Sequence, residues 1–148
     1  MARMAVDGWM EPTPEKRRAM QRQRERDTGP EMACRRELHR RGLRYRIHRR
    51  PVAGLRRTID IVFPTELVAV ECRGCYWHMC PEHRSLPKRN AEWWEAKLTA
   101  NVRRDEATVR ELTAAGWELI VVWEHEDVRR AADRIEAAVR RRRPHPPA

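Results

Sequence analysis

The segment from Glu71 to His83 concentrates residue types that bind metals and transfer protons. It holds three of the four cysteines and two of the six histidines of the 148-residue chain. Glu71 and Arg73 follow directly on an apolar run, and Asp60 lies about one strand and turn upstream. A carboxylate followed by a Glu-x-basic triplet at a strand end is the skeleton of a metal-dependent nuclease. The segment therefore predicts a zinc site and a catalytic site that share one stretch of chain.

Acidic and basic side chains around this segment fit phosphodiester hydrolysis. The reaction builds negative charge on the phosphoryl oxygens and expels an alkoxide, so nucleases hold magnesium on carboxylates beside the scissile phosphate. We expect Asp60 to be a magnesium ligand and Arg73 to neutralise the developing charge. Glu71 has two readings, as a second acid at the metal or as a salt-bridge partner that points into the core. His78 is a candidate general base that activates a metal-bound water, with zinc binding as the alternative.

Three residues of the segment have a spacing typical of zinc sites. The pattern Cys75-x4-Cys80-x2-His83 supplies three soft or borderline ligands, and a structural zinc ion takes a fourth. Two residues compete for that position. Cys72 would make a local zinc knuckle, whereas His125, at the end of a distant apolar run, would tie the segment to the core.

Four aromatic residues lie in polar surroundings near these candidates: Tyr76, Trp77, Trp93 and Trp94. An exposed indole or phenol usually has a stacking partner. In a DNA-binding protein such side chains wedge between base pairs, and the unstacking cost is smallest where pairing is already poor, as at a mismatch. For Trp94 the alternative is a place in a helix core, because it falls on the apolar period of its segment.

The charge of the chain points to a polyanionic partner. Lysine and arginine number 32 against 22 acidic residues, which gives a formal net charge of +10 and a pI near 10.6. Nucleic acid is the first candidate. The sequence has neither a signal-peptide pattern nor a run of about 18 apolar residues, so we expect a cytoplasmic protein without membrane association. Thiols stay reduced in that compartment, which favours metal ligands over disulfides.

Turn signals and apolar periodicity divide the chain into elements. Thr28, Pro30 and Glu31 form a capping box in which the Glu31 side chain reaches back, and Gly42 ends the helix that follows. The patterns predict a helix over 29–41, strands over 43–48, 59–63 and 67–71, a long helix from 91 that Gly116 ends, a buried central strand over 117–123 and a helix from about Asp127. Because strand 117–123 follows a helix, we expect it to pair in parallel.

The same patterns predict which side chains point inward. Alternation places Asp60 on the face opposite Ile59 and Ile61. On the long helix, the expected buried residues are Trp94, Leu98, Val102, Val109 and Leu112. On the last helix, they are Val128, Ala131, Ile135, Ala138 and Val139.

The order helix, three strands, helix, strand, helix predicts a fold of the α/β class. It contains the α-β-β-β-α-β core of the restriction-endonuclease-like fold, with a mixed central sheet and flanking helices, to which the cysteine segment would add a structural zinc site. We expect three regions: a basic N-terminal arm over 1–27, an endonuclease domain over 28–140 and a flexible basic, proline-rich tail over 141–148.

The chain resembles the very short patch repair (Vsr) DNA mismatch endonucleases from about Lys16 to Glu126. The matching motifs are Met20 with Arg26-Asp27-Thr28-x-Pro30-Glu31, Asp60-Ile61-Val62-Phe63, Gly74-Cys75-Tyr76-Trp77-His78, Glu92-Trp93-Trp94 with Lys97, Asn101-Val102-x-Arg104-Asp105, and Gly116-Trp117-x5-Trp123-Glu124. The resemblance implies a magnesium-dependent endonuclease with a structural zinc. Such an enzyme nicks one strand of duplex DNA 5′ to the thymine of a T:G mismatch, which arises when 5-methylcytosine deaminates.

The resemblance also implies roles for single residues and a set of partners. Asp60 and the backbone carbonyl of Cys72 would hold magnesium, His78 would be the general base, and Glu31 an accessory acid beside Glu71 and Arg73. The implied DNA-intercalating residues are Tyr76, Trp77 and Trp94, and the implied zinc ligands are Cys75, Cys80, His83 and His125. The implied partners are double-stranded DNA with a T:G mismatch, mismatch-repair proteins and a cognate cytosine methyltransferase. We expect a monomer at the nucleoid of a bacterial cytoplasm.

The chain departs from the family pattern just before Gly74. Cys72 and Arg73 stand where the family commonly has a small or polar residue and then His or Asp, and Glu71 replaces an apolar residue. Arg73 is always protonated, so it cannot exchange a proton as a second histidine would. Two alternatives follow: a related restriction or defence endonuclease that acts on unmismatched or modified DNA, and a zinc-containing DNA-binding protein with impaired catalysis.

Overall fold

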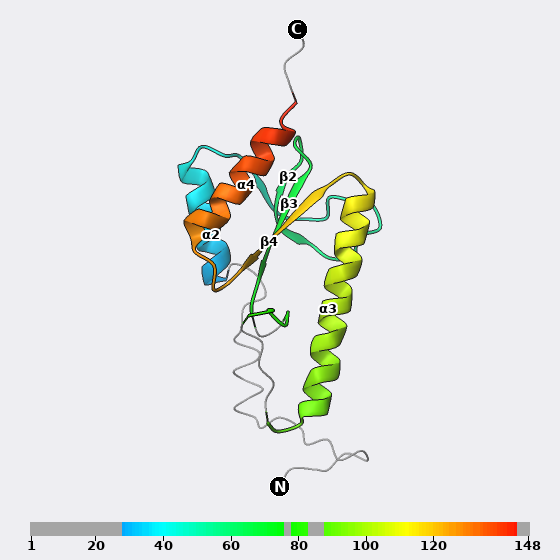
Figure 1. Cartoon of the computed structure of the whole chain (residues 1–148). Coiled ribbons are helices and arrows are strands. Elements are labelled where there is room, and N and C mark those ends of the chain that lie inside the picture. Colours follow the sequence, from blue (N-terminus) through cyan, green and yellow to red (C-terminus); the bar gives the residue numbers. More distant parts are fainter. Residues whose placement is uncertain (1–27, 76–77, 83–87, 145–148) are drawn as a thin grey trace.

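The computed structural model of the chain describes residues 28–75, 78–82 and 88–144 (Figure 1). Its elements in chain order are α2 (Gly29–Arg40), β1 (Arg46–Arg49), β2 (Ile59–Phe63), β3 (Val68–Arg73), α3 (Ala91–Ala114), β4 (Glu118–Trp123) and α4 (Val128–Arg142). The predicted order of helices and strands is confirmed. The predicted arm over 1–27 lies outside the described residues. Within those ranges, no helix has the length and apolar character needed to cross a membrane.

The strands form one mixed sheet in the order β1-β2-β3-β4. Strands β1, β2 and β3 pair antiparallel, whereas β4 pairs parallel to β3 from Val68↔Glu118 to Arg73↔Trp123. The predicted parallel pairing of the last strand is therefore confirmed. Helix α3 makes the long crossover that a parallel pair requires. Figure 1 shows α3 on one side of the sheet and the packed pair α2 and α4 on the other.

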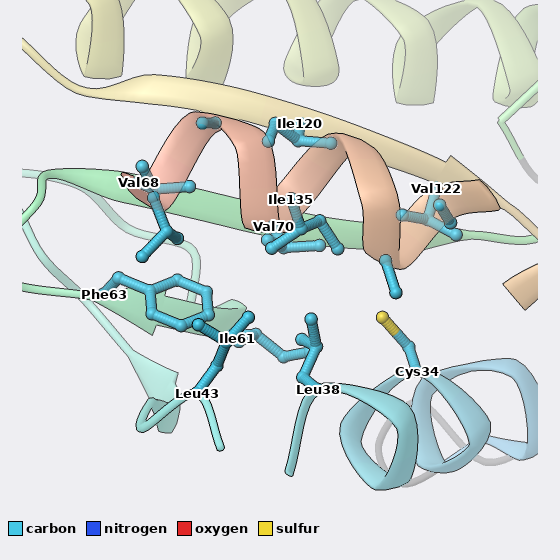
Figure 2. Close-up of a cluster of buried hydrophobic side chains, with 14 residues drawn as sticks. Cys34, Leu38, Leu43, Ile61, Phe63, Val68, Val70, Ile120, Val122 and Ile135 are labelled. Atoms are coloured by element: carbon cyan, nitrogen blue, oxygen red, sulfur yellow. The ribbon is translucent and has the colours of Figure 1, made fainter. Parts of the chain in front are cut away.

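Two apolar clusters hold these layers together. The larger cluster joins α2 and α4 to the sheet, and Figure 2 shows its side chains converging from both helices and from the strands. Its strand members are Ile61, Phe63, Val68, Val70, Ile120 and Val122. The smaller cluster includes Leu112 of α3 together with Leu55, Ile59, Val62 and Ala69. Both faces of the sheet are therefore anchored, which fixes the strand ends that carry the candidate site.

The predicted helix ends are confirmed. The Thr28 hydroxyl accepts the Glu31 N–H (3.4 Å), and the Asp127 carboxylate accepts two N–H groups of the first turn of α4. Gly42 after α2 and Gly116 after α3 have φ values of 80° and 85°, in the left-handed region that favours glycine. The Glu31 carboxylate lies in the interior, so the described residues show one half of the predicted capping box.

The prediction that strand 117–123 is central is wrong for the described part of the chain. There β4 pairs with β3 alone and is an edge strand. Its apolar run has another cause: Ile120 and Val122 pack in the larger cluster, whereas Trp117 and Leu119 pack against the smaller one. Both faces of the strand are thus covered. An apolar run predicts that both faces of a strand are buried, but it does not predict that both of its edges pair with other strands.

Two patterns also fail in β1 and β2. Strand β1 begins at Arg46 and is exposed except at His48, so the predicted half-buried strand over 43–48 is shorter and more open. Ile59 belongs to the smaller cluster and Ile61 to the larger one. The two isoleucines therefore do not share the face that simple alternation assigned to them.

The buried face of α3 differs from its predicted apolar stripe. Leu98 and Leu112 are buried as expected, but Val109 is 38% exposed. Asp105 and Thr108 are buried instead. The predicted stripe contained apolar residues only. The buried face of α3 also includes the Asp105 carboxylate, so it lies closer to Thr108 than to Val109. On α4 the predicted inward residues are confirmed, with Val128 half-buried.

Candidate functional site

The carboxyl-terminal ends of β3 and β4 lie side by side because the two strands pair in parallel up to their last residues. The Glu124 N–H donates to the carbonyl of Arg73 (3.0 Å), which continues the pairing past β4. The Glu124 carboxylate in turn accepts the Cys75 N–H (2.9 Å). The cysteine segment after β3 is therefore held against the residues that follow β4.

Three of the four predicted zinc ligands come together at this junction. The sulfurs of Cys75 and Cys80 lie 3.1 Å and 3.5 Å from Nδ1 of His125. A turn in which the Cys80 N–H donates to the Cys75 carbonyl (2.9 Å) brings the two buried cysteines together. His83 lies outside the described residues. Cys72 is not among the ligand atoms of this group, which all lie within 4.8 Å of one another.

The chemistry of these three groups fits a zinc ion. Two ligands of a tetrahedral zinc, each at about 2.0–2.3 Å from the metal, are roughly 3.5 Å apart, close to the sulfur–nitrogen distances found here. Burial and the neighbouring Cys80 thiol raise the pKa of Cys75 to about 11, so a cation is needed to stabilise its thiolate at neutral pH. Nε2 of His125 lies 3.3 Å from the Glu82 carboxylate, an outer contact that orients the ring.

A second group of metal-ligand atoms lies where β2 begins and β3 ends. Glu31 from the first turn of α2, His48 from β1 and Asp60 from β2 place their ligand atoms within 4.8 Å of one another. The Cys72 N–H donates to Oδ2 of Asp60 (2.8 Å), so the end of β3 orients this carboxylate. Glu31 is 2% exposed, and Nε2 of His48 lies 3.5 Å from its Oε1.

Glu31 has the guanidinium of Arg35 at 3.5 Å from its Oε1, whereas the carboxylate of Asp60 is poorly neutralised. Burial raises the pKa of Asp60 to about 6, with smaller upward contributions from the charges of Glu31 and Glu71. The Cys72 N–H and the charge of His48 act in the opposite direction. An acid that is costly to ionise alone favours a nearby divalent cation, and carboxylate oxygens are the ligands of Mg²⁺. The group therefore fits the predicted magnesium site.

His78 forms a pair with Asp105, a residue to which the sequence patterns assigned no role. Nδ1 of His78 lies 2.7 Å from Oδ2 of Asp105, whose side chain is 5% exposed. Burial would raise the pKa of Asp105, but the bonds to His78 and Arg57 outweigh it and lower that pKa. A carboxylate at Nδ1 fixes the ring and leaves Nε2 as the nitrogen that accepts a proton. This is the arrangement that a general base requires.

Glu71 and Arg73 pair with each other. Nε and Nη2 of Arg73 donate to Oε2 of Glu71 at 3.1 Å and 2.8 Å, and both side chains are at most 10% exposed. In the structure Glu71 is a salt-bridge partner of Arg73, which is one of the two roles that the sequence left open. Nε of Arg73 also lies 4.0 Å from Oδ2 of Asp105. Arg73 is therefore held beside the His78–Asp105 pair.

Arg57 connects the histidine pair to the carboxylate group. It donates from Nη1 to Oδ1 of Asp105 at 2.6 Å. Burial would lower the pKa of Arg57, but that bond and the charges of Glu71, Asp105 and Asp60 raise it. One fixed cation thus interacts with acids of both groups, which places the two groups within electrostatic reach of each other.

The predicted intercalating aromatics are described only in part. Trp94 lies half-buried near the start of α3, with its ring edge-on to Trp93 at a centroid distance of 4.8 Å. Nζ of Lys97 lies 5.1 Å and 5.7 Å from the two ring centroids, close enough for cation–π attraction. Tyr76 and Trp77 lie outside the described residues.

Sequence reasoning missed two residues of the site, His48 and Asp105. Asp105 had a signal, because it lies midway between Leu98 and Leu112 on the buried side of α3, where an acid needs a partner. The family resemblance includes this aspartate but was not used to give it a role. His48 had no local signal, since its contact with Glu31 and Asp60 exists only once α2 packs beside β1 and β2.

The α/β fold gathers a carboxylate group and a histidine–aspartate pair at one end of its sheet, an arrangement that fits a metal-dependent hydrolase. Comparison with known proteins identifies the family. The family model described as DNA mismatch endonuclease Vsr matches residues 11–84. The chain belongs to the Vsr family of DNA endonucleases.

Several relatives cover most of the chain. It is 43% identical to the type II nicking enzyme V.NaeI of Lentzea aerocolonigenes, over 77% of this chain and 70% of that protein. It is 41% identical to the type II nicking enzyme V.XorIIP of Xanthomonas oryzae, over 77% of this chain and 83% of that protein. Identity to the DNA mismatch endonuclease Vsr of Escherichia coli is 29%, over 67% of this chain and 62% of that protein.

Proposed function

We propose that the protein is a magnesium-dependent endonuclease that nicks one strand of duplex DNA 5′ to the thymine of a T:G mismatch. The observation that carries this proposal is the joint placement of the Glu31–His48–Asp60 group and the His78–Asp105 pair at one end of the sheet. Membership of the Vsr family and the net charge of +10 support a DNA substrate. The expected setting is the bacterial cytoplasm, with mismatch-repair proteins and a cognate cytosine methyltransferase as partners.

Each residue of the site has a role in this proposal. Asp60 and the backbone carbonyl of Cys72 hold magnesium, and the Cys72 N–H keeps the Asp60 carboxylate in place. Glu31 is the accessory acid. Bound magnesium would supply Lewis-acid stabilisation of the charge that develops on the phosphate. His78 accepts the proton of the attacking water at Nε2, and Asp105 fixes its ring.

Arg73 stands where a second proton-transferring residue is common in the family, but it cannot transfer a proton. Its guanidinium remains charged, so it donates hydrogen bonds to a phosphate but takes no proton. Glu71 holds Arg73 in position, and Arg57 does the same for Asp105. We therefore assign Glu71 a positioning role, and we place proton abstraction on His78 alone.

The remaining predicted residues recognise the lesion and stabilise the site. Tyr76, Trp77 and Trp94 are the proposed wedge at the mismatch. Cys75, Cys80, His83 and His125 are the proposed zinc ligands, and zinc would fix the segment that carries His78 to the end of β4. The proposed endonuclease domain spans 28–140, between a basic arm over 1–27 and a tail over 141–148.

A second candidate function is favoured by the names of the more similar relatives, which are type II nicking enzymes. The buried Glu71–Arg73 pair resembles the acidic and basic members of a general restriction-nuclease triplet. In this alternative the protein is a defence endonuclease that cuts unmismatched or modified DNA. Nothing in the described residues favours the third reading, a DNA-binding protein with impaired catalysis.

A matched pair of duplexes tests the proposal. The purified protein is incubated with Mg²⁺ and two duplexes that differ in a single T:G pair, and the products are separated under denaturing conditions. We expect one nick, 5′ to the mismatched thymine. Asp60→Ala should abolish it, whereas Asp133→Ala, which removes a carboxylate that is 69% exposed on α4, should not. Equal cutting of both duplexes would support the defence endonuclease.

A further inference from the structure

His48 is turned inward by an unusual backbone conformation. It has φ 50°, in the left-handed region that side-chain-bearing residues rarely adopt. The other residues of β1 are exposed, whereas the His48 side chain is 14% exposed. Strained backbone at a residue of this kind persists where the surrounding structure requires it, and it is concentrated at ligand sites. We therefore expect the contacts of the His48 imidazole to explain why this backbone conformation is kept.

The imidazole points to the two acids of the carboxylate group. Its Nε2 lies 3.5 Å from Oε1 of Glu31, and both atoms belong to the group that includes an oxygen of Asp60. Oε1 of Glu31 is buried and makes no hydrogen bond within the described part of the chain. A nitrogen–oxygen separation of this size exceeds the usual hydrogen-bond range of about 2.7–3.2 Å. Nη2 of Arg35 also lies 3.5 Å from this oxygen, again beyond a good hydrogen bond. A buried anionic oxygen that neither the ring nitrogen nor the guanidinium bonds closely leaves room for a metal ion.

The separation fits two ligands of one metal ion. Ligand atoms about 2.1 Å from an octahedral ion are roughly 3.0 Å apart when adjacent and about 4.2 Å apart when opposite. The ligand atoms of Glu31, His48 and Asp60 all fall within 4.8 Å of one another. The three residues come from α2, β1 and β2, and all three are held by secondary structure. The site therefore offers one nitrogen and several carboxylate oxygens to an ion.

We propose that His48 is a ligand of the metal that Asp60 and Glu31 hold, and that this nitrogen makes the site bind Mn²⁺ more tightly than Mg²⁺. Mg²⁺ prefers oxygen ligands and keeps its waters, whereas imidazole binds transition-metal ions better. The inference rests on the proposed metal-dependent function of this site and extends it to the choice of metal. The other role open to His48 is an ion pair with Glu31 that takes no part in binding the metal.

Metal binding without DNA separates the two roles. Mn²⁺ is titrated into the protein as purified, and the free ion is followed by electron paramagnetic resonance; Mg²⁺ binding is measured by calorimetry. We expect wild-type protein to bind Mn²⁺ at least about tenfold more tightly than Mg²⁺. His48→Gln should weaken Mn²⁺ binding about tenfold and Mg²⁺ binding by less than about threefold. His39→Gln, which changes an exposed histidine of α2, is the matched control and should change neither affinity.

A spectroscopic measurement keeps the test decisive if His48→Gln lowers stability. Electron spin echo modulation of bound Mn²⁺ detects the nitrogen of a coordinated imidazole. We expect this signal in wild-type protein and in His39→Gln, and its loss in His48→Gln. Absence of the nitrogen signal in wild-type protein, or equal Mn²⁺ affinity of wild-type protein and His48→Gln, would overturn the proposal. Because no DNA is present, a failure to nick T:G duplexes leaves this outcome unaffected and counts against the proposed function alone.

Discussion

The two candidate metal-ligand groups in the described part of the chain are built in different ways. The cysteine–histidine group takes two ligands from one turn, Cys75 and Cys80, and reaches across to His125 beside β4. The carboxylate group takes Glu31, His48 and Asp60 from three separate elements. Close spacing in the sequence revealed the two cysteines of the first group but not His125, and no spacing revealed the whole of the second. A structural clamp can thus take most of its ligands from one turn, whereas the reactive site is assembled entirely by tertiary packing.

The groups also differ in how the absence of a bound cation affects the stability of the folded protein. At the cysteine–histidine group, the raised pKa of Cys75 keeps its thiol neutral, and a neutral thiol is tolerated in the interior. Without zinc, however, the segment that contains the two cysteines is no longer linked to His125. At the carboxylate group, the raised pKa of Asp60 means that the folded protein carries an unfavourable ionised acid at neutral pH. Zinc removal should therefore lower stability, whereas removal of the Asp60 charge should raise it.

The largest effect is expected at the cysteine–histidine group. Cys80→Ser should abolish zinc binding and lower the Tm by at least about 10 °C, because metal-binding free energy is folding free energy at a structural site. Elemental analysis and thermal unfolding measure both quantities. Cys72→Ser is the control and should keep its zinc. Zinc lost from Cys72→Ser but retained in His125→Ala would show that the fourth ligand is Cys72, as in a local knuckle.

The next effect concerns the His78–Asp105 pair. Asp105→Asn should slow single-turnover nicking by about 10²–10³-fold, because an amide at Nδ1 no longer stabilises the charged ring or fixes its tautomer. The dependence of the rate on pH should also change in this variant, a change that a loss of stability alone would not produce. Glu106→Gln removes the adjacent, exposed carboxylate of α3 and should leave both quantities unchanged. An unchanged rate and pH profile in Asp105→Asn would contradict the positioning role of Asp105.

The third effect is a gain in stability. The pKa of Asp60 is raised from 3.8 to about 6 in the folded protein, so the folded state binds a proton more tightly than the unfolded state between these values. Stability from this group is present below about pH 4 and is lost as pH rises through 6. Metal-free Asp60→Asn should therefore be more stable than wild type by roughly 2–3 kcal/mol at pH 7–8, and the difference should vanish near pH 4.

Urea unfolding of both proteins at several pH values checks this prediction. The Asn side chain still accepts the Cys72 N–H, so the substitution isolates the charge. Destabilisation by Asp60→Asn at pH 8 would show that the Asp60 carboxylate is already neutralised without a metal.

The smallest effect is expected at Trp94. If its ring wedges at the mismatch, Trp94→Ala should reduce the preference for T:G over matched duplex about tenfold, as loss of one base-stacking contact predicts. Val109→Ala, at an exposed position of the same helix, is the control. A lowered Tm with an unchanged T:G preference would instead assign Trp94 to the helix core, the alternative that the sequence left open.

The sequence predicted well the features that depend on neighbours in the chain. The caps at Thr28 and Asp127 and the glycine ends of α2 and α3 follow from local chemistry and are confirmed. Of the predicted cysteine–histidine spacing, Cys75 and Cys80 lie together, whereas His83 lies outside the described residues. Features that depend on other elements were missed. Ile59 and Ile61 pack in different clusters, which simple alternation did not predict, and β4 is apolar because helices cover both of its faces.

The candidate site follows the same division. Asp60 and His78 could be chosen from residue type and position, since an acid in an apolar strand and a histidine beside cysteines are uncommon. Asp105 was given no role, although its spacing from Leu98 placed it on the inward side of the helix. His48 could not be found, because its role requires the packing of α2 against β1 and β2 and a left-handed backbone that no pattern predicts.

The most direct test of the central claim is a single-turnover comparison of two duplexes that differ in one T:G pair, cut by wild-type protein and by Asp60→Ala in Mg²⁺. The account predicts one nick, 5′ to the mismatched thymine, that is absent from the matched duplex and from the variant. Equal cutting of both duplexes would contradict the mismatch claim, and cutting that survives in Asp60→Ala would contradict the placement of the reactive site.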